Sequence, residues 1–258
     1  MSLPTNLPTA TSLTGTVAWV LGGGSGIGEG AALALAASGA TVIVSGRREA
    51  ELAKVAAKAA AAGSTGQVFG VPVDVSDAAD VAQAAQRIAD EHGTVGILVY
   101  SAGTNVTNRY WRDTTPEDYA RVLDINLTGA MRAVHAVLPG MRAQQDGLVL
   151  IVSSWAGFRF APGVGAGYST SKTALGQLVE TINHQERLNG IRATHLCPGE
   201  VKTDILKLRP QVPTEEQQAL MLTPQDMGDA VSYLAHLPAR ICVNEFVITP
   251  TTNTSYDF

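Results

Sequence analysis

The sequence predicts an α/β fold built on one parallel, doubly wound β-sheet with helices on both faces. Short apolar runs rich in β-branched residues alternate with longer amphipathic segments along the chain. The apolar runs are continuous, with no regular alternation of polar residues, which is typical of strands that are buried on both faces. Right-handed crossovers between parallel strands would then place helices on either side of the sheet.

Each element has a local signal. Strands are expected in seven short apolar runs, of which ATVIVS at 40–45 and GLVLIVS at 147–153 are the clearest: 16–21, 40–45, 67–73, 96–100, 147–153, 191–196 and 244–249. Helices are expected in the amphipathic segments between the runs, where acidic starts and glycine ends mark the boundaries. These segments are 31–38, 49–62, 77–92, one or two helices within 116–139, 168–189 and 224–236.

We expect a single domain, because an open α/β sheet of 258 residues is routinely one unit. Residues 1–14 are rich in Pro and Thr and are predicted to be a flexible N-terminal tail, so that the domain spans 15–258. The segment 203–223 is the least regular part of the chain and contains Pro210 and Pro213. It is the predicted substrate lid.

Composition excludes several classes of function. The formal net charge is −5 and the basic residues form no stripe, which argues against a nucleic-acid partner. No apolar run approaches the roughly 20 residues needed to cross a bilayer, and the N-terminus lacks the pattern of a signal peptide. We therefore expect a cytoplasmic protein without a membrane partner and without a bound metal. Cys197 and Cys242 are expected to be reduced thiols, with a disulfide between them left open.

A glycine cluster lies between the first predicted strand and the first predicted helix. Glycines at this place permit a tight turn and let the backbone approach a pyrophosphate, while the helix N-terminus offers free N–H groups. The pattern favours a Rossmann-type dinucleotide-binding loop, and a tight turn without a ligand is the alternative. The residues expected to bind the cofactor here are Gly22, Gly24, Ser25, Gly26, Ile27 and Gly28.

The residues after the second strand favour NADP(H) over NAD(H). An acidic residue at this position would bond the ribose 2′-hydroxyl, whereas a basic one would accept a 2′-phosphate. The chain has Arg47 and Arg48 there, preceded by a glycine, and the alternative for Arg47 is a solvated residue at a helix start. Asp74 and Val75, after the third strand, are expected near the adenine; for Asp74 a helix-capping role is the alternative.

Tyr168 and Lys172 are spaced to lie on one face of a helix. A phenol with its ordinary pKa near ~10 is a poor base at neutral pH, but neighbouring positive charges would lower that pKa. Ser154 follows an apolar strand, at the end of the sheet where ligands bind, and its hydroxyl can bond a substrate oxygen. Asn126 is expected to link Lys172 to bulk water, with a hydrogen bond in the core as the alternative.

Taken together, these motifs resemble the short-chain dehydrogenase/reductase family over roughly residues 15–205. The resemblance implies that Tyr168 is the general acid/base, that Lys172 binds the nicotinamide ribose, that Ser154 orients the substrate and that Asn126 supports a proton relay. It also implies further cofactor contacts from residues that follow later strands: Ser101, Ala102, Gly103, Pro198, Gly199, Val201 and Thr203.

The chain departs from the family pattern at four places, one of which is the segment 243–251, where the usual Asp-Gly-Gly ending is absent. Leu21 stands where Thr is usual, Tyr100 and Ser101 replace a pair of Asn, and the interval from Ser154 to Tyr168 is one residue longer than usual. The resemblance implies oxidation of a secondary alcohol or reduction of a carbonyl, in a homodimer or homotetramer formed through the helices at 130–137 and 168–189. A non-catalytic redox sensor or regulatory subunit of the same fold is the alternative.

Aromatic residues, scarce elsewhere, gather just after the fifth strand. They favour an apolar or aromatic carbonyl substrate, and packing at a subunit edge is the alternative reading. The residues considered for the substrate pocket are Ser154, Trp155, Phe158, Phe160, Tyr168, Trp111 and Glu200.

Overall fold

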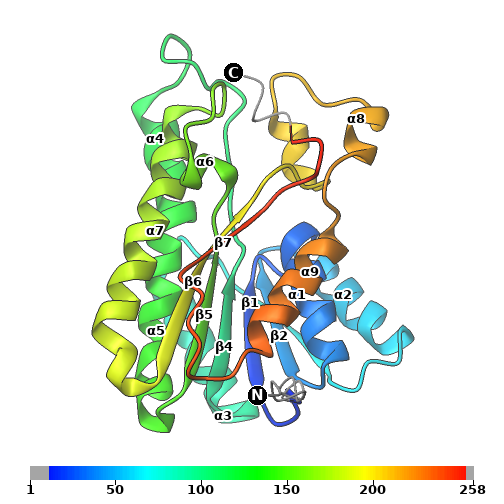
Figure 1. Cartoon of the computed structure of the whole chain (residues 1–258), viewed down its shortest axis with the longest axis vertical. Helices are drawn as coiled ribbons and strands as arrows, with labels where there is room; N and C mark the ends of the chain where they lie inside the picture. The colour runs from blue at the N-terminus through cyan, green and yellow to red at the C-terminus, as the bar shows by residue number, and fades with distance from the viewer. Residues whose placement is uncertain (1–11, 254–258) are drawn as a thin grey trace, which may run out of the picture.

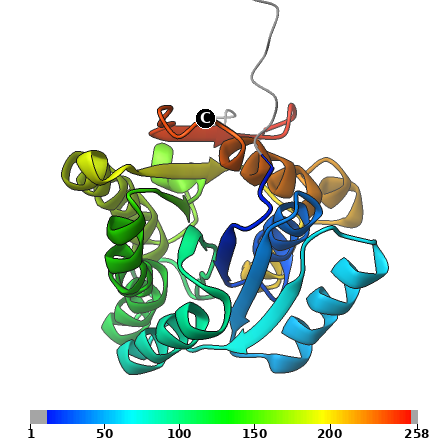
Figure 2. The same ribbon diagram turned by 90° about the horizontal axis from the view of Figure 1, so that it is seen from below.

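A computed structural model describes residues 12–253, which form a parallel sheet between two layers of helices (Figures 1 and 2). The sheet of the described residues has seven strands in the order β3-β2-β1-β4-β5-β6-β7. The predicted doubly wound α/β architecture is therefore confirmed. The strands are β1 Val17–Leu21, β2 Thr41–Gly46, β3 Val68–Pro72, β4 Val95–Tyr100, β5 Gly147–Val152, β6 Ile191–Pro198 and β7 Glu245–Ile248.

Two sets of helices cover the two faces of the sheet (Figure 1). One layer contains α1 Gly26–Ala37, α2 Glu49–Ala61 and α9 Pro224–Ala235. The other contains α3 Ala78–His92, α4 Pro116–Leu123, α5 Gly129–Gln144 and α7 Ala166–Glu186. Two short helices, α6 Trp155–Phe158 and α8 Glu215–Ala219, lie at the carboxyl end of the sheet.

The sheet has an apolar core on each of its faces. Both cores receive side chains from the same strands, because successive side chains of a strand point to opposite faces. In β1, Trp19 and Leu21 belong to the core beneath α3, α5 and α7, whereas Ala18 and Val20 belong to the core beneath α1, α2 and α9. Every residue of β1 is buried. A continuous apolar run is thus what a strand buried on both faces requires.

Helix boundaries differ from the predicted ones at glycine or proline residues, because the low helix propensity of these residues predicts a helix end where the helix in fact continues. Helix α1 begins at Gly26, five residues before the predicted start, because a glycine-rich turn carries little helix propensity. Helix α5 continues through Pro139 to Gln144, beyond the predicted end. Between α4 and α5, residues Asp124–Thr128 form a π-helical turn. The segment 203–223 contains a 3₁₀ turn at Asp204–Leu208 as well as α8.

The termini bear on two further predictions. Most of the predicted N-terminal tail, and residues 254–258 of the predicted domain, lie outside the described residues. Leu13, within that tail, is buried and its N–H donates to the carbonyl of Ser38 at 3.2 Å. Among residues 12–253, no helix combines the length and apolar character needed to cross a membrane.

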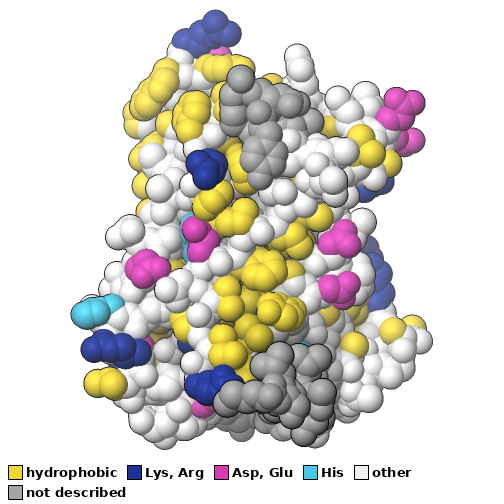
Figure 3. Space-filling model, viewed as in Figure 1, with side chains coloured by type: hydrophobic (Ala, Val, Ile, Leu, Met, Phe, Trp, Pro, Cys, Tyr) yellow, Lys and Arg dark blue, Asp and Glu magenta, His cyan; other side chains and the backbone are white. Residues whose placement is uncertain are grey.

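One outer face of the molecule carries apolar side chains over α9 and β7 (Figure 3). Tyr233 of α9 and Val247 of β7 are both exposed, and the ring of Tyr233 lies 6.2 Å from that of Phe246. Strand β7 is the edge strand on this side of the sheet, so these residues extend the core to the surface.

Candidate functional site

A cavity of about 910 Å³ opens at the carboxyl ends of the strands. The strand order reverses between β1 and β4, and in open parallel sheets the crevice at such a point is where ligands bind. The cavity is lined by the loops after β1, β2, β4, β5 and β6 and by the segment around residues 203–211. Most of the predicted site residues therefore lie around one space.

The glycine loop forms the cofactor end of this cavity. Gly22 has a φ of +77°, and a Cβ atom there would lie 2.5 Å from the backbone N of Ala102. A Cβ atom on Gly28 would lie 2.2 Å from the carbonyl oxygen of Gly22. These positions need glycine because the turn folds against its own helix and against the loop after β4. Of the predicted loop residues, Gly28 is buried behind the turn and does not line the cavity.

The N-terminus of α1 opens into the cavity, where its unpaired N–H groups and its dipole favour an anion. Arg47 and Arg48 lie beside it, and Nη2 of Arg48 donates to Oγ of Ser25 at 3.2 Å. No acidic residue stands at the end of β2, where Gly46 is followed directly by the two arginines. The residues present therefore fit the phosphate groups of a dinucleotide.

Asp74 lines the cavity as predicted, but its side chain also organises its own loop. Oδ1 of Asp74 accepts from the backbone N–H of Ser76 at 2.9 Å and from Oγ of Ser76 at 2.6 Å. The hydrogen bonds from Ser76 lower the pKa of the Asp74 carboxyl. The capping of α3 that was the alternative role for Asp74 belongs to Asp77, which accepts from the N–H groups of Ala79 and Asp80.

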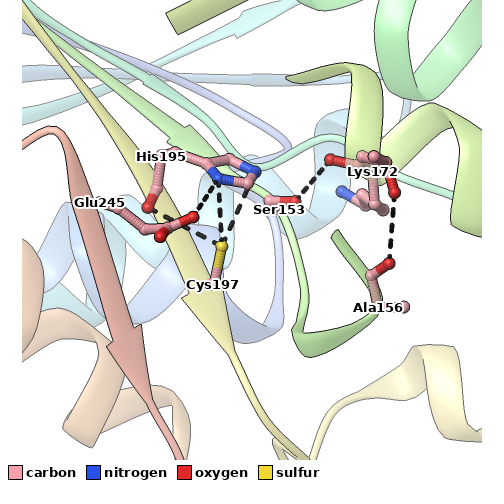
Figure 4. Close-up of polar contacts among 7 residues, drawn as sticks. Ser153, Ala156, Lys172, His195, Cys197 and Glu245 are labelled. Atoms are coloured by element: carbon pink, nitrogen blue, oxygen red, sulfur yellow. Dashed lines mark hydrogen bonds and ion pairs between the residues drawn. The ribbon is translucent and has the colours of Figure 1, made fainter. Parts of the chain in front are cut away.

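Tyr168, Lys172 and Ser154 line the same cavity. Tyr168 and Lys172 are one turn apart on α7, and Nζ of Lys172 lies 5.7 Å from the centre of the Tyr168 ring. The hydroxyl of Ser154 accepts from the N–H of Ala156 at 3.2 Å, which caps α6. The preceding serine has a different role: Oγ of Ser153 donates to the backbone carbonyl of Lys172 at 2.9 Å (Figure 4).

Burial acts in opposite directions on the two groups of α7. It raises the pKa of the Tyr168 phenol, an effect opposed by the Ser154 hydroxyl and by the positive charges of Arg109 and Arg209. Burial also lowers the pKa of Lys172 to about 8. The ammonium donates to the carbonyl oxygen of Val152 at 2.8 Å, so it is held at the end of β5. Both changes are those expected when a charged form loses water.

Asn126 lies behind the cavity wall and is completely buried. Its Oδ1 accepts from the N–H of Thr104 at 2.8 Å, while Nδ2 donates to the carbonyl of Thr104 and to Oγ of Ser171. The amide thus pins the loop after β4 to α7. The hydroxyl of Tyr100, which replaces the usual Asn, donates to the carbonyl of Ile125 and holds the π-helical turn that carries Asn126.

The aromatic residues predicted for the substrate pocket are dispersed. Trp155 is buried and lines the cavity, whereas Phe160 and Trp111 are 81% and 82% exposed and do not line it. Phe158 packs edge-on against Trp155, outside the lining. The longer loop before Tyr168 contributes small residues instead, among them Ala161, Pro162 and Gly163. Phe160 and Trp111 are therefore poor candidates for substrate contacts.

The remaining predicted residues line the cavity between the cofactor end and the segment 203–223: Val75, Ser101, Ala102, Gly103, Pro198, Gly199, Glu200, Val201 and Thr203. Val201 pairs with Leu222 in a parallel bridge that closes the base of the segment 203–223. Two arginines that sequence reasoning missed, Arg109 and Arg209, also line the cavity. Neither belongs to a motif, because each reaches the site through an irregular loop.

A polar cluster of His195, Cys197 and Glu245 lies beside Ser153 (Figure 4). Nδ1 of His195 lies 3.1 Å from Oε1 of Glu245 and 3.3 Å from Sγ of Cys197. Burial and the charge of Glu245 raise the pKa of the Cys197 thiol to about 12, so the thiol stays protonated at neutral pH. Both cysteines are free: Cys197 is buried and Cys242 is exposed.

Comparison with known proteins agrees with this arrangement. The sequence profile of the short chain dehydrogenase family matches residues 16–212. Uncharacterized oxidoreductases of Listeria innocua and of Staphylococcus aureus are each 30% identical over 240 residues; these cover 90% and 93% of this chain and 95% and 99% of the relatives. A glycine betaine reductase of Emericella nidulans is 32% identical over 243 residues, but the match spans only 19% of that protein.

Solved structures show the same fold. An alcohol dehydrogenase from the archaeon Thermococcus sibiricus, complexed with 5-hydroxy-NADP, has a TM-score of 0.80 at 28% identity and covers 92% of this chain and 97% of its own. A metagenomic short-chain oxidoreductase in complex with NADP has a TM-score of 0.80 at 26% identity, over 93% of this chain and 99% of its own.

Proposed function

We propose, from the premise that this chain belongs to the short-chain dehydrogenase family, that it transfers a hydride between NADP(H) and a secondary alcohol or carbonyl substrate. One observation carries the proposal: Ser154, Tyr168 and Lys172 line the same cavity as the glycine loop. The reacting carbon of the substrate would lie between the hydroxyl pair and the nicotinamide. The bound cofactor would supply or accept the hydride.

The side chains of the chain would handle the proton and the substrate oxygen. In the reducing direction, the Tyr168 phenol would donate its proton to the carbonyl oxygen, which the Ser154 hydroxyl would also bond. In the oxidising direction, the Tyr168 phenolate would accept the proton of the alcohol. Lys172 would bind the nicotinamide ribose through its ammonium, and its charge would favour the phenolate. Asn126 would act indirectly, by holding the loop after β4.

The substitution Tyr168→Phe tests this proposal. It removes one hydroxyl from a side chain that lines the cavity, so the fold and NADP(H) binding should persist. We expect oxidation of NADPH with a panel of ketones and aldehydes to fall by roughly 10²–10⁴-fold, the usual contribution of a positioned acid or base. Binding of NADPH, followed by its fluorescence, should change by less than about threefold.

The matched control is Tyr233→Phe, because Tyr233 is an exposed tyrosine on α9 that does not line the cavity. A Tyr168→Phe enzyme that keeps most of its rate would refute the proposed mechanism. A wild-type protein that binds NADPH and turns over no carbonyl or alcohol would instead favour the redox sensor or regulatory subunit.

Two expectations about the whole protein remain part of this proposal. We propose a homodimer or homotetramer, with the long helices α5 and α7 as the expected contact, and a cytoplasmic location. Light scattering coupled to size-exclusion chromatography measures the mass in solution, to be compared with the 26.9 kDa of one chain. A monomeric mass at micromolar concentration would contradict the oligomer.

A further inference from the structure

Arg109 is a buried cation without a carboxylate partner. The residue is 9% exposed, yet none of the ion pairs found among residues 12–253 includes it. Nε donates to the carbonyl of Val106 and Nη2 to that of Leu208, each at 2.7 Å. Two neutral carbonyls orient the guanidinium but do not neutralise its charge, and a buried unpaired charge is costly.

The free edge of this guanidinium is accessible. Nη1 of Arg109 donates a hydrogen bond to no described residue. It is not one of the fully buried side-chain atoms that lack a partner, so it remains in contact with solvent. Arg109 lines the cavity. The stem of the side chain passes Gly165, where a Cβ atom would lie 3.1 Å from its own Cβ. Gly165 begins the segment that leads into α7 and Tyr168, so the charge is held on the same wall as the phenol.

The surrounding charges leave this end of the cavity positive. Arg209 also lines it, and its charge is paired with Glu200 through Nη1 and Oε1 at 2.7 Å. The other carboxylates of the lining lie at the cofactor end, where each feels the charge of Arg47 or Arg48: Glu51, Asp74 and Asp204. Lys172 adds a further ammonium near Tyr168. Among the carboxylates that line this cavity, Glu200 alone lies with these cations at the Tyr168 end.

We infer that the substrate carries a carboxylate close to its reacting carbon, and that the free edge of Arg109 binds this carboxylate. The inference deepens the proposed function and rests on it: the substrate would be a hydroxy acid in one direction and the corresponding keto acid in the other. A guanidinium suits this task because its planar N–H groups match the two oxygens of a carboxylate. The apolar or aromatic carbonyl substrate expected from the sequence would then also carry an acid group, with Trp155 lining the cavity where an apolar substituent could contact it.

The kinetic test compares an acid with its uncharged ester. Benzoylformate and methyl benzoylformate share the ketone and the ring, and NADPH oxidation reports turnover of each. We expect the wild-type enzyme to prefer the acid, and Arg109→Met to lower kcat/KM for the acid by roughly tenfold or more, mostly through KM. The ester should change by less than about threefold. Arg112→Met, which removes an arginine that is 81% exposed on the same loop, is the matched control.

A binding experiment separates this inference from the proposed function. Benzoate is a carboxylate without a reducible carbonyl, and benzamide is its neutral counterpart; calorimetry measures the affinity of each for the NADP⁺ complex. We expect benzoate to bind more tightly than benzamide, and Arg109→Met to weaken benzoate alone by roughly tenfold. Arg109→Lys keeps the positive charge and should therefore retain part of the preference for benzoate over benzamide. Retention of that preference would show that substitution at this position leaves the loop folded.

Each outcome has a distinct meaning. Turnover of the ester in preference to the acid, or equal losses for both with Arg109→Met, would overturn the carboxylate subsite while leaving the dehydrogenase function intact. Failure to turn over either ketone, together with benzoate binding that depends on Arg109, would overturn the reaction and retain the subsite. Equal or absent benzoate binding in the wild type and in Arg109→Met would contradict the subsite directly.

Discussion

Lys172 and Tyr168 illustrate how burial sets the chemistry of single residues. The pKa of Lys172 is lowered to about 8, so the ammonium is charged below that pH and loses its proton above it. The pKa of Tyr168 is raised by burial, so the phenol keeps its proton throughout the neutral range. Carbonyl reduction needs the protonated phenol and, in this mechanism, the charged lysine. Neutral pH supplies both.

The pH profile of the two directions should therefore differ. For reduction, kcat/KM should be flat through neutral pH and fall as the pH rises past about 8, where Lys172 loses its charge. For oxidation, which needs the phenolate as well as the charged lysine, kcat/KM should rise with pH toward about 8 as the ionised fraction of Tyr168 grows, and should rise no further once Lys172 loses its charge. Initial rates in a constant-ionic-strength buffer from pH 6 to 10 measure both. A reduction profile that stays flat to pH 10 would contradict the role given to the charge of Lys172.

The residues predicted from sequence were those that lie next to an element boundary or at helical spacing. Tyr168 and Lys172 are one turn apart, and Ser154 follows a strand, so local geometry placed them together. Arg109 had no such signal, because its contact with Leu208 joins residues that are 99 positions apart in the chain. Phe160 was misplaced for the converse reason: it is near Trp155 in sequence, but the loop between α6 and α7 turns it into solvent.

At the scale of elements, α5 and α7 are tied together by one well-formed ion pair. Glu186 at the end of α7 is 5% exposed and accepts from Nε and Nη2 of Arg142 on α5 at 2.9 and 2.6 Å. Asn189 donates to the same carboxylate at 2.8 Å. These bonds lower the pKa of Glu186 to about 2. The carboxylate is therefore more stable in the folded chain than in the unfolded one.

The substitution Glu186→Gln should lower the free energy of unfolding at pH 7 by about 1 kcal/mol, a modest value because Arg142 is half exposed. A depressed carboxyl pKa stabilises the fold above the ordinary pKa of about 4.5, and this contribution is lost as the pH falls toward 2. The difference between the variant and the wild type should shrink over that window. Urea unfolding at several pH values measures it, with Glu180→Gln on the exposed face of α7 as the control.

The type and order of the helices and strands could be predicted, because the periodicity of apolar residues is a local property of the sequence. The ends of these elements could not, because they depend on tertiary contacts. The start of α1 is fixed by the approach of Gly28 to Gly22, which the weak helix propensity of glycine does not reveal. The π-helical turn before α5 is held by Tyr100 from a different strand. A single sequence gives no sign of that bond.

At the scale of the whole molecule, the cavity is lined by loops from both halves of the sheet, so a bound cofactor would contact both halves. A ligand that binds only the folded chain raises its stability, by about 2.7 kcal/mol at 100 times its Kd. For a chain of this size we expect NADP⁺ at that concentration to raise Tm by roughly 5–10 °C. At equal concentration NAD⁺ should raise it by less, because the position after β2 is occupied by Arg47 and Arg48 rather than by an acid.

Arg47→Ala tests the origin of that difference. The variant should lose most of the additional shift produced by NADP⁺ while its response to NAD⁺ stays nearly the same, since only the former has a 2′-phosphate for the guanidinium to bind. Differential scanning fluorimetry across a concentration series of each nucleotide gives both responses. Equal losses for the two nucleotides would contradict the assignment of NADP(H).

The close contact between α1 and α9 limits where this protein can be cut. A Cβ atom on Gly30 of α1 would lie 1.8 Å from the carbonyl oxygen of Pro224, and one on Gly228 of α9 would lie 2.4 Å from that of Gly30. The two helices therefore meet backbone to backbone, and α9 supports the helix whose N-terminus faces the cofactor end of the cavity. A fragment ending at residue 212, where the family match ends, would keep every predicted site residue. We expect this fragment to fail to bind nucleotide, because it lacks α9, which packs against α1. The segment that matches the family profile is therefore shorter than the segment needed to form the folded domain.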